Sequence, residues 1–153
     1  MSPKPRKQIK RLVTLNLRTS RKGIRQVLGD LEADIMELLW KNSPVTVRDV
    51  HTKLAKKRTI AYTTVMTVMS RLAEKGLLKR EHRGRAYLYS PTQNREEFCS
   101  DAISTVMTGL LGGFGEPVLS HFVDTIGSED RENLDELIRL IETKKKNEEK
   151  SAT

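Results

Sequence analysis

Hydroxyl and guanidinium groups occupy one side of the segment YTTVMTVMSRLAEK, residues 62–75, where the exposed face of a soluble helix usually carries glutamate and lysine. At about 100° per residue, the Val65, Val68, Met69 and Leu72 side chains fall together on the other side and are predicted to be core. Threonine hydroxyls can hydrogen-bond base edges, their methyl groups can contact thymine methyls, and arginine can reach guanine or a phosphate. The predicted DNA base contacts are Tyr62, Thr63, Thr64, Thr67, Ser70 and Arg71. The alternative is a solvated helix face that is rich in threonine.

A cluster of cationic side chains follows in the segment KREHRGR, residues 79–85. Residues 77–80 and 86–89 are predicted strands, joined by a turn over residues 81–85 that is centred on Gly84. Cations at a hairpin tip favour contacts with phosphates, which supply affinity and salt dependence but little sequence information. The predicted contacts with the DNA backbone are Arg80, His82, Arg83 and Arg85. By themselves they could equally be a solvated hairpin tip, but directly after the threonine-rich helix they favour DNA binding.

Three predicted helices come before this hairpin. The first runs from about Leu28 to the stop at Asn42-Ser43-Pro44, and it carries acids in its first turn, where the helix dipole favours them. The second begins at Thr46, which resembles a helix N-cap because Asp49 follows three residues later. The third is the threonine-rich segment, with Gly76 as its C-cap. Three helices followed by a basic hairpin is the order of a winged helix, in which the third helix enters the major groove and the wing lies on the backbone.

The predicted fold is therefore mainly α with a small β-hairpin wing, an N-terminal winged helix-turn-helix joined to a C-terminal helical dimerisation part. We assign residues 28–91 to the DNA-binding domain, 92–146 to the dimerisation domain and 147–153 to a frayed tail. Residues 1–27 are predicted to be a disordered basic arm. Three readings of the arm stay open: an arm that contacts DNA, a disordered segment without a task, and the product of a wrong start codon with a GTG start at Val27.

Charge is unevenly distributed along the 153 residues, whose net charge is +8. Residues 1–26 contain nine Lys/Arg and no acid, and residues 27–90 contain twelve Lys/Arg and seven acids. Residues 91–153 contain seven Lys/Arg and thirteen acids. A basic N-terminal half joined to an acidic C-terminal half indicates a polyanion partner for the first and a different task for the second.

The tail is predicted to contain three short helices with apolar faces, separated by breaks at Gly112-Gly113 and Gly127-Ser128. Pro117 suits the start of the middle helix. Three short helices cannot bury such faces alone, so we expect them to pair with a second copy of the chain. The predicted homodimer interface consists of Phe98, Val106, Leu110, Phe122, Leu134, Leu137, Ile138 and Ile141.

Other classes of site have no signature in the sequence. The single cysteine, Cys99, excludes a disulfide framework or a multi-cysteine metal cluster, and the three histidines have no metal-ligand spacing. No Gly-rich phosphate loop, catalytic triad or pair of acids with catalytic spacing occurs, so we predict no enzyme, no catalytic or metal residue and no cofactor. With no run of eighteen apolar residues and no secretory signal, we expect no membrane insertion and a cytoplasmic protein.

Three segments carry a resemblance to a known family: LGDLEADIMELLW, TVRDVHTKLAKKRTIAYTTVMTVMSRLAEKGLL and RGRAYLYSP. From about Leu28 to Ile141 the chain resembles the penicillinase-repressor (BlaI/MecI) family of bacterial winged-helix transcriptional regulators. GGF at residues 112–114 and SHFVD at 120–124 also look like the dimerisation part of that family.

The resemblance implies a homodimer that binds a dyad-symmetric DNA operator and represses genes such as those for β-lactamase and its sensor. It also implies a sensor-dependent protease as a partner, because in the best-known members a membrane sensor triggered by a β-lactam leads to cleavage of the repressor. That cut falls at an Asn-Phe bond. The matching position here is near Ser104-Thr105, and the sequence contains no Asn-Phe pair.

Two other functions compete with a repressor. The first is a nucleoid-type or RNA-binding protein, which would use its basic charge without sequence preference. The second is an interaction module whose winged helix grips protein, although such modules usually lack a basic recognition face.

Overall fold

The structure is a computed structural model, and it describes residues 17–18, 20–129 and 131–153. Residues 1–16 and 19 of the predicted arm lie outside this description. The chain divides into two compact units, Met1–Val106 and Met107–Thr153, and each is described by itself.

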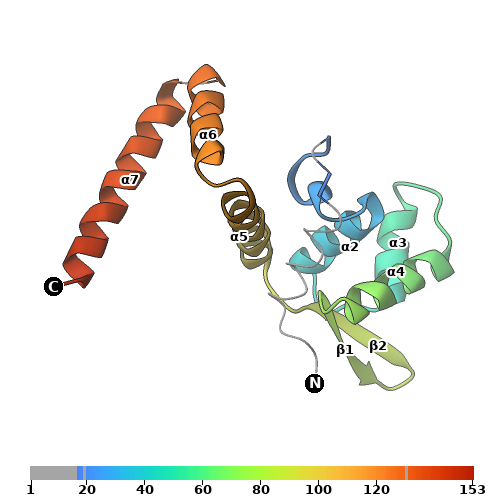
Figure 1. Cartoon of the computed structure of the whole chain (residues 1–153). Helices are drawn as coiled ribbons and strands as arrows, with labels where there is room; N and C mark the ends of the chain where they lie inside the picture. Colours follow the sequence, from blue (N-terminus) through green and yellow to red (C-terminus); the bar gives the residue numbers. More distant parts are fainter. Residues whose placement is uncertain (1–16, 19, 130) are drawn as a thin grey trace. The chain divides into compact units, whose positions relative to one another are not determined.

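The N-terminal unit has the element order of a winged helix-turn-helix, as predicted (Figure 1). A 3-10 helix, η1 (Gly23–Gln26), precedes the helices α2 (Asp30–Lys41), α3 (Val47–Ala55) and α4 (Tyr62–Glu74). The hairpin of β1 (Leu78–Arg83) and β2 (Ala86–Pro91) follows, and then α5 (Arg95–Phe114), which crosses the division between the units.

Local hydrogen bonds explain where these helices begin and end. The Asp49 N–H donates to Thr46 Oγ1 at 3.2 Å and the Thr46 N–H donates to Asp49 Oδ2 at 2.9 Å, so the predicted cap of α3 is confirmed. The Thr46 N–H and the Thr46 hydroxyl both donate to the Asp49 carboxylate, and these bonds hold the pKa of that carboxyl below its usual value. At the other end of the motif Gly76 has a φ of 77°, and the Leu77 N–H donates to Leu72 O at 3.0 Å to close α4.

The hairpin is antiparallel, with Arg83 opposite Ala86 at its tip. Gly84 has a φ of 63°, which a two-residue hairpin turn requires and glycine adopts without strain. Both strands are longer than predicted. Val45 also pairs with Tyr89, through N–H to O bonds of 3.1 and 2.8 Å, so the segment before α3 supports the base of the wing.

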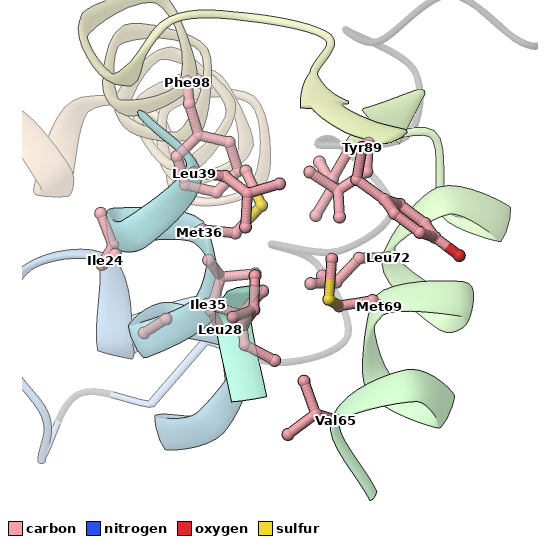
Figure 2. Close-up of a cluster of buried hydrophobic side chains, with 14 of the residues drawn as sticks. Ile24, Leu28, Ile35, Met36, Leu39, Val65, Met69, Leu72, Tyr89 and Phe98 are labelled. Atoms are coloured by element: carbon pink, nitrogen blue, oxygen red, sulfur yellow. The ribbon is translucent and has the colours of Figure 1, made fainter. Parts of the chain in front are cut away.

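The core of the unit lies between α2, α4 and β2 (Figure 2). The apolar stripe of α4 faces it, because Val65, Met69 and Leu72 are fully buried. Val68 is half-buried at its margin. The buried side chains that meet this stripe include Leu28, Ile35, Met36, Leu39, Val50, Leu54, Leu77, Leu78, Tyr89 and Phe98.

The position of Phe98 corrects the sequence prediction, which placed it at a dimer interface. Its side chain is only 1% exposed and packs beside Leu39 and Met36 in the core of its own chain (Figure 2). Its ring centroid lies 5.4 Å from that of Trp40, whose indole N–H donates to Gln93 O at 3.0 Å. The first turns of α5 therefore complete the winged-helix core, and the compact unit ends at Val106 and not at Pro91.

The segment before α2 also differs from the prediction of a disordered arm to residue 27. Ile24 is 8% exposed, Val27 7% and Leu28 1%, so all three belong to the core. Ile24, Val27 and Leu28 span little more than one helical turn after a basic segment, which is too short to establish a helical period, so helical periodicity did not reveal them.

The C-terminal unit contains the last turns of α5, then α6 (Glu116–Glu129) and α7 (Arg131–Ser151). The predicted breaks at Gly112-Gly113 and Gly127-Ser128 are wrong, because α5 and α6 continue through them. A glycine inside a helix costs only about 1 kcal/mol, whereas the actual turn uses Gly115 at a φ of 63°. The predicted frayed tail is helical to Ser151.

Candidate nucleic-acid interface

The polar face of α4 is exposed, with Thr63, Thr64, Thr67 and Arg71 all turned away from the buried stripe. Tyr62 is 45% exposed, and Ser70 is half-buried at the edge of the face. Glu74 is the only acid in α4, and no acid lies in the first turn. The face can therefore approach a polyanion without carboxylate repulsion along most of its length.

His51 of α3 fixes the start of α4. Its Nε2 lies 2.9 Å from Ile60 O, two residues before the helix begins. Its ring also meets Tyr62 edge-on, with 5.6 Å between ring centroids. Both contacts hold the first exposed aromatic side chain of α4 against the helix that precedes it.

A charged contact fixes the C-terminal end of α4. Lys75 Nζ donates to Glu32 Oε1 at 2.6 Å, and the Gly29 N–H donates to Glu32 Oε2 at 2.9 Å. Burial raises the pKa of the Glu32 carboxyl, but the bonds from Lys75 and Gly29 outweigh burial and leave that pKa below its usual value. The ionised carboxylate thus joins the N-terminus of α2 to the C-terminus of α4.

The Thr67 hydroxyl has a defined hydrogen-bonding direction. It donates to Thr63 O, one turn earlier in α4, at 2.8 Å. A hydroxyl has a single proton to donate, so towards a partner outside the helix Thr67 offers oxygen lone pairs and a methyl group.

The predicted basic cluster of the wing is divided between the two faces of the hairpin. Arg80 and His82 lie on one face, because they are opposite Tyr89 and Tyr87 in the register. Arg83 alternates onto the other face with Lys79 and Glu81, and Arg85 lies in the turn. All four predicted wing cations are exposed, but they do not form one patch.

Tyr87 is a wing residue that the sequence analysis missed. It is 44% exposed; the Arg80 guanidinium carbon lies 5.0 Å from its ring centre, and the His82 ring meets it edge-on at 4.9 Å. The ring therefore orients Arg80 through a cation–π contact and His82 through an edge-on ring contact. The alternation of Tyr87 and Tyr89 was the available signal, since it places both rings on the face that carries Arg80 and His82.

Comparison with known proteins assigns the family. A family model described as "Penicillinase repressor" matches residues 28–140. The chain belongs to the penicillinase-repressor family. "Transcriptional regulator BlaI" of Mycobacterium tuberculosis (strain H37Rv) is 37% identical over 117 residues, which cover 75% of this chain and 85% of that protein. "Penicillinase repressor" of Bacillus licheniformis is 30% identical over 121 residues, covering 77% of this chain and 91% of the relative.

Two solved structures are also similar to parts of the chain. The solution structure of the DNA binding domain of the repressor BlaI is 31% identical, has a TM-score of 0.43 and matches 50% of this chain and 93% of that one. The Bacillus licheniformis BlaI monomeric form in complex with the blaP half-operator is 30% identical, with a TM-score of 0.41 and coverage of 46% and 85%. The family assignment itself rests on the sequence matches.

Membership of the penicillinase-repressor family makes the chain a DNA-binding transcriptional repressor and not an enzyme. Within the part of the chain that the structure describes, no group of three or more acids, cysteines or histidines could hold a metal ion. Among the same residues, no helix is long and apolar enough to cross a membrane.

The remaining residues of the predicted dimer interface are spread over α5, α6 and α7. Val106 is half-buried against the winged-helix core. In the C-terminal unit α6 packs on α7, with Leu134 and Leu137 half-buried, yet no described residue of α7 is fully buried. Four apolar side chains of the predicted set are 39–49% exposed: Leu110, Phe122, Ile138 and Ile141.

Proposed function

We propose that this repressor binds a specific dyad-symmetric operator as a homodimer, with α4 in the major groove and the wing on the phosphate backbone. The observation that carries the proposal is the exposed, nearly acid-free hydroxyl face of α4 beside a cationic hairpin, in a member of the penicillinase-repressor family. The core stripe, His51 and Glu32 hold that face as a rigid surface. Rigid presentation favours sequence reading, because base contacts depend on position to within a fraction of an ångström.

The roles proposed for α4 and the wing differ. Thr63, Thr64, Thr67 and Arg71, with Tyr62 and Ser70 at the edge of the face, contact base edges. Arg80, His82, Arg83 and Arg85 contact the phosphate backbone, and the contribution of the arginines, which neutralise phosphates, falls as salt rises. Because the wing cations lie on two hairpin faces, they would contact phosphates on both sides of the wing.

The C-terminal unit supports the proposed homodimer. Exposed apolar side chains recur on all three of its helical segments, including Leu111 at 41%, Phe114 at 69% and Leu119 at 55%. A second copy would cover these surfaces and bring a second reading helix to the other half of the operator.

We also propose that proteolysis relieves repression, by a cut at the expected position near Ser104-Thr105. Ser104 and Thr105 lie inside α5, and Thr105 Oγ1 donates to Asp101 O at 2.8 Å within that helix. A protease would need to unwind α5 locally before it could cut there.

The test is selection of genomic fragments that the full-length protein retains, followed by competition between the selected operator and a shuffled duplex of the same length. We expect the operator to be bound at least about a thousandfold more tightly at physiological salt, as for specific regulators in general. Equal affinity for both duplexes would instead favour the nucleoid-type alternative, which uses charge without sequence choice.

A further inference from the structure

Residues 20–27, which we call the N-terminal strap, precede the residues that match the family model. The strap is nevertheless part of the folded unit. Ile24 and Val27 are buried in the core, and the Val27 and Leu28 N–H groups donate to Ile24 O at 3.1 and 2.9 Å. Gln26 Nε2 donates to Arg21 O at 2.9 Å and closes the strap on itself.

The arginines of the strap are engaged by acids of α2. Arg21 pairs with Asp30 at 3.2 Å. Arg25 donates to the Asp30 carboxylate at 3.2 Å and to the Asp30 backbone O at 3.0 Å, and its other terminal nitrogen bonds Asp34. Both guanidinium groups are thus held against the first turns of α2.

Asp34 links the strap to the helix-turn-helix motif. Its second carboxylate oxygen accepts from Arg58, in the turn between α3 and α4. The Asp34 side chain is 30% exposed and those of Arg25 and Arg58 are each 38% exposed, so the cluster is only partly solvated. Arg58 lies four residues before Tyr62, and the Lys57 and Arg58 N–H groups both donate to Leu54 O, at 2.9 and 3.1 Å.

We propose that the N-terminal strap braces the α3–α4 turn through Asp34 and so sets the operator affinity of α4 without itself contacting DNA. The inference deepens the proposed function and rests on it. Removing Arg25 leaves Asp34 bonded to Arg58 alone and frees the carboxylate to follow that side chain. The turn then keeps its link to α2 through Asp34 but loses the one to the strap and its buried Ile24, so the start of α4 becomes less fixed.

An ordinary surface ion pair contributes little to stability, and this is the alternative to be excluded. The discriminating variant is Arg25→Met in the full-length chain. It should weaken operator binding by roughly three- to tenfold, the net effect of about one typical hydrogen bond, because the pair is partly solvated. The slope of log K against log salt should stay at the parent value, because every cation that neutralises a phosphate is still present. Amide exchange at Lys57 and Arg58 should become faster.

Arg95→Met is the matched control. Arg95 also pairs with an acid of α2, Glu37 at 2.9 Å, but it bonds no residue of the α3–α4 turn. It should leave unchanged both the operator affinity and the rate of amide exchange at Lys57 and Arg58. Asp34→Asn should reproduce the Arg25→Met effects, and Arg25→Lys should restore part of them.

Each outcome decides between the explanations. A lower salt slope in Arg25→Met would show that Arg25 contacts phosphate and would overturn the proposal. Unchanged turn exchange in both Arg25→Met and Asp34→Asn would also overturn it, even if affinity fell with global stability. Amide exchange at Lys57 and Arg58 is measured without DNA, so it tests the brace independently of operator binding. If the parent protein showed no operator preference, only the proposed function would fail.

Discussion

At the scale of single residues, the exposed face of α4 carries three kinds of group that could be matched by DNA bases in the proposed complex. Thr67 presents an oxygen acceptor and a methyl group, since its proton is held by Thr63 O. Arg71 presents donors only, and it is the only arginine in α4. Acceptors suit the exocyclic amino groups of adenine and cytosine, methyl groups suit thymine, and the arginine suits guanine.

Thr67→Val should weaken operator binding by about 1–3 kcal/mol and change base preference, because it keeps the methyl group and replaces the hydroxyl acceptor with a second methyl. Thr67→Ser, which keeps the oxygen, should retain preference at amino-bearing bases. The measurement is competition between the native operator and single-base variants. Thr143→Val is the control, since Thr143 makes the same local bond to Arg139 O on α7 at 2.9 Å. If Thr67→Val bound every site as the parent does, α4 would not read bases through this residue.

Arg71→Ala should likewise cost about 1–3 kcal/mol at the operator and relax preference at one guanine. The same competition series checks it. A uniform loss on all sequences would mean that Arg71 contacts a phosphate and carries no sequence information.

In the wing, Arg83→Ala and Arg85→Ala should weaken binding to all sequences alike and lower the salt slope by roughly one for each phosphate that is no longer neutralised. Titration of affinity against salt measures the slope. Arg139→Ala on α7 provides the comparison, because Arg139 is exposed and paired with Glu136 within its own helix. A slope that stayed at the parent value would remove the wing from the interface.

At the scale of elements, the ends of helices decide how the reading surface is held. Glu32 serves two helix ends at once, as acceptor for the Gly29 N–H of α2 and for Lys75 after α4. Glycines matter only where the backbone needs them: Gly115 is left-handed, whereas Gly112 and Gly113 are ordinary helix residues with open space where a Cβ would lie.

Glu32→Gln should lower the free energy of unfolding by about 1–2 kcal/mol at pH 7, because it weakens a partly buried charged bond. Folding lowers the pKa of Glu32 from its ordinary value of 4.5, so the carboxylate contributes its full stabilisation at pH values above 4.5. This contribution is lost as the pH falls through the folded-state pKa. Denaturant unfolding of both proteins should therefore differ at pH 7 and converge in that acidic range. A difference that persisted there would mean that packing, and not charge, accounts for the loss.

Gly112→Ala and Gly113→Ala should each stabilise α5 by about 0.5–1 kcal/mol, because alanine restricts the unfolded chain and fits the helix. Gly115→Ala should be destabilising by about 1–2 kcal/mol, because alanine is strained at a φ of 63°. Thermal unfolding at one fixed protein concentration compares the three. If Gly112→Ala and Gly115→Ala had the same sign, the break between the helices would lie elsewhere.

At the scale of the whole molecule, α5 belongs to both compact units, so the place at which the chain is cut decides what is tested. A cut after Pro91 removes Phe98 and Ala102 from the core, and loss of a buried phenylalanine costs about 3–5 kcal/mol. A chain that ends at Val106 keeps both residues.

The chain truncated after Val106 should be a folded monomer that binds one half-site as well as the full-length protein does. On a two-half-site operator its affinity should fall by orders of magnitude, because the second half-site is no longer met at high effective concentration. Sedimentation of both chains, paired with binding to one and two half-sites, provides the measurement. A truncated chain that still dimerised, or a full-length chain that stayed monomeric at micromolar concentration, would place the interface elsewhere.

The sequence by itself determined the winged helix and the two faces of α4. Periodicity places Val65 and Met69 on one side of the helix and Thr67 on the other, because a helix repeats every 3.6 residues whatever it packs against. Caps such as Thr46 with Asp49 and turns such as the one at Gly84 are equally local, so the start of α3 and the place of the hairpin could be predicted, although β1 extends three residues further than expected. The family motifs lie in this same region.

Only the tertiary structure decided which surfaces remain free. Phe98 continues the apolar row of α5, and periodicity cannot tell whether that row meets a second chain or its own core. Ile24 and Val27 lie in a short basic segment without a sustained apolar pattern, and the Asp34 link between Arg25 and Arg58 joins positions 33 residues apart in sequence. Such contacts depend on chain segments distant in sequence coming together, which no local pattern encodes, and they decide which predicted surface residues are available to DNA or to a second copy.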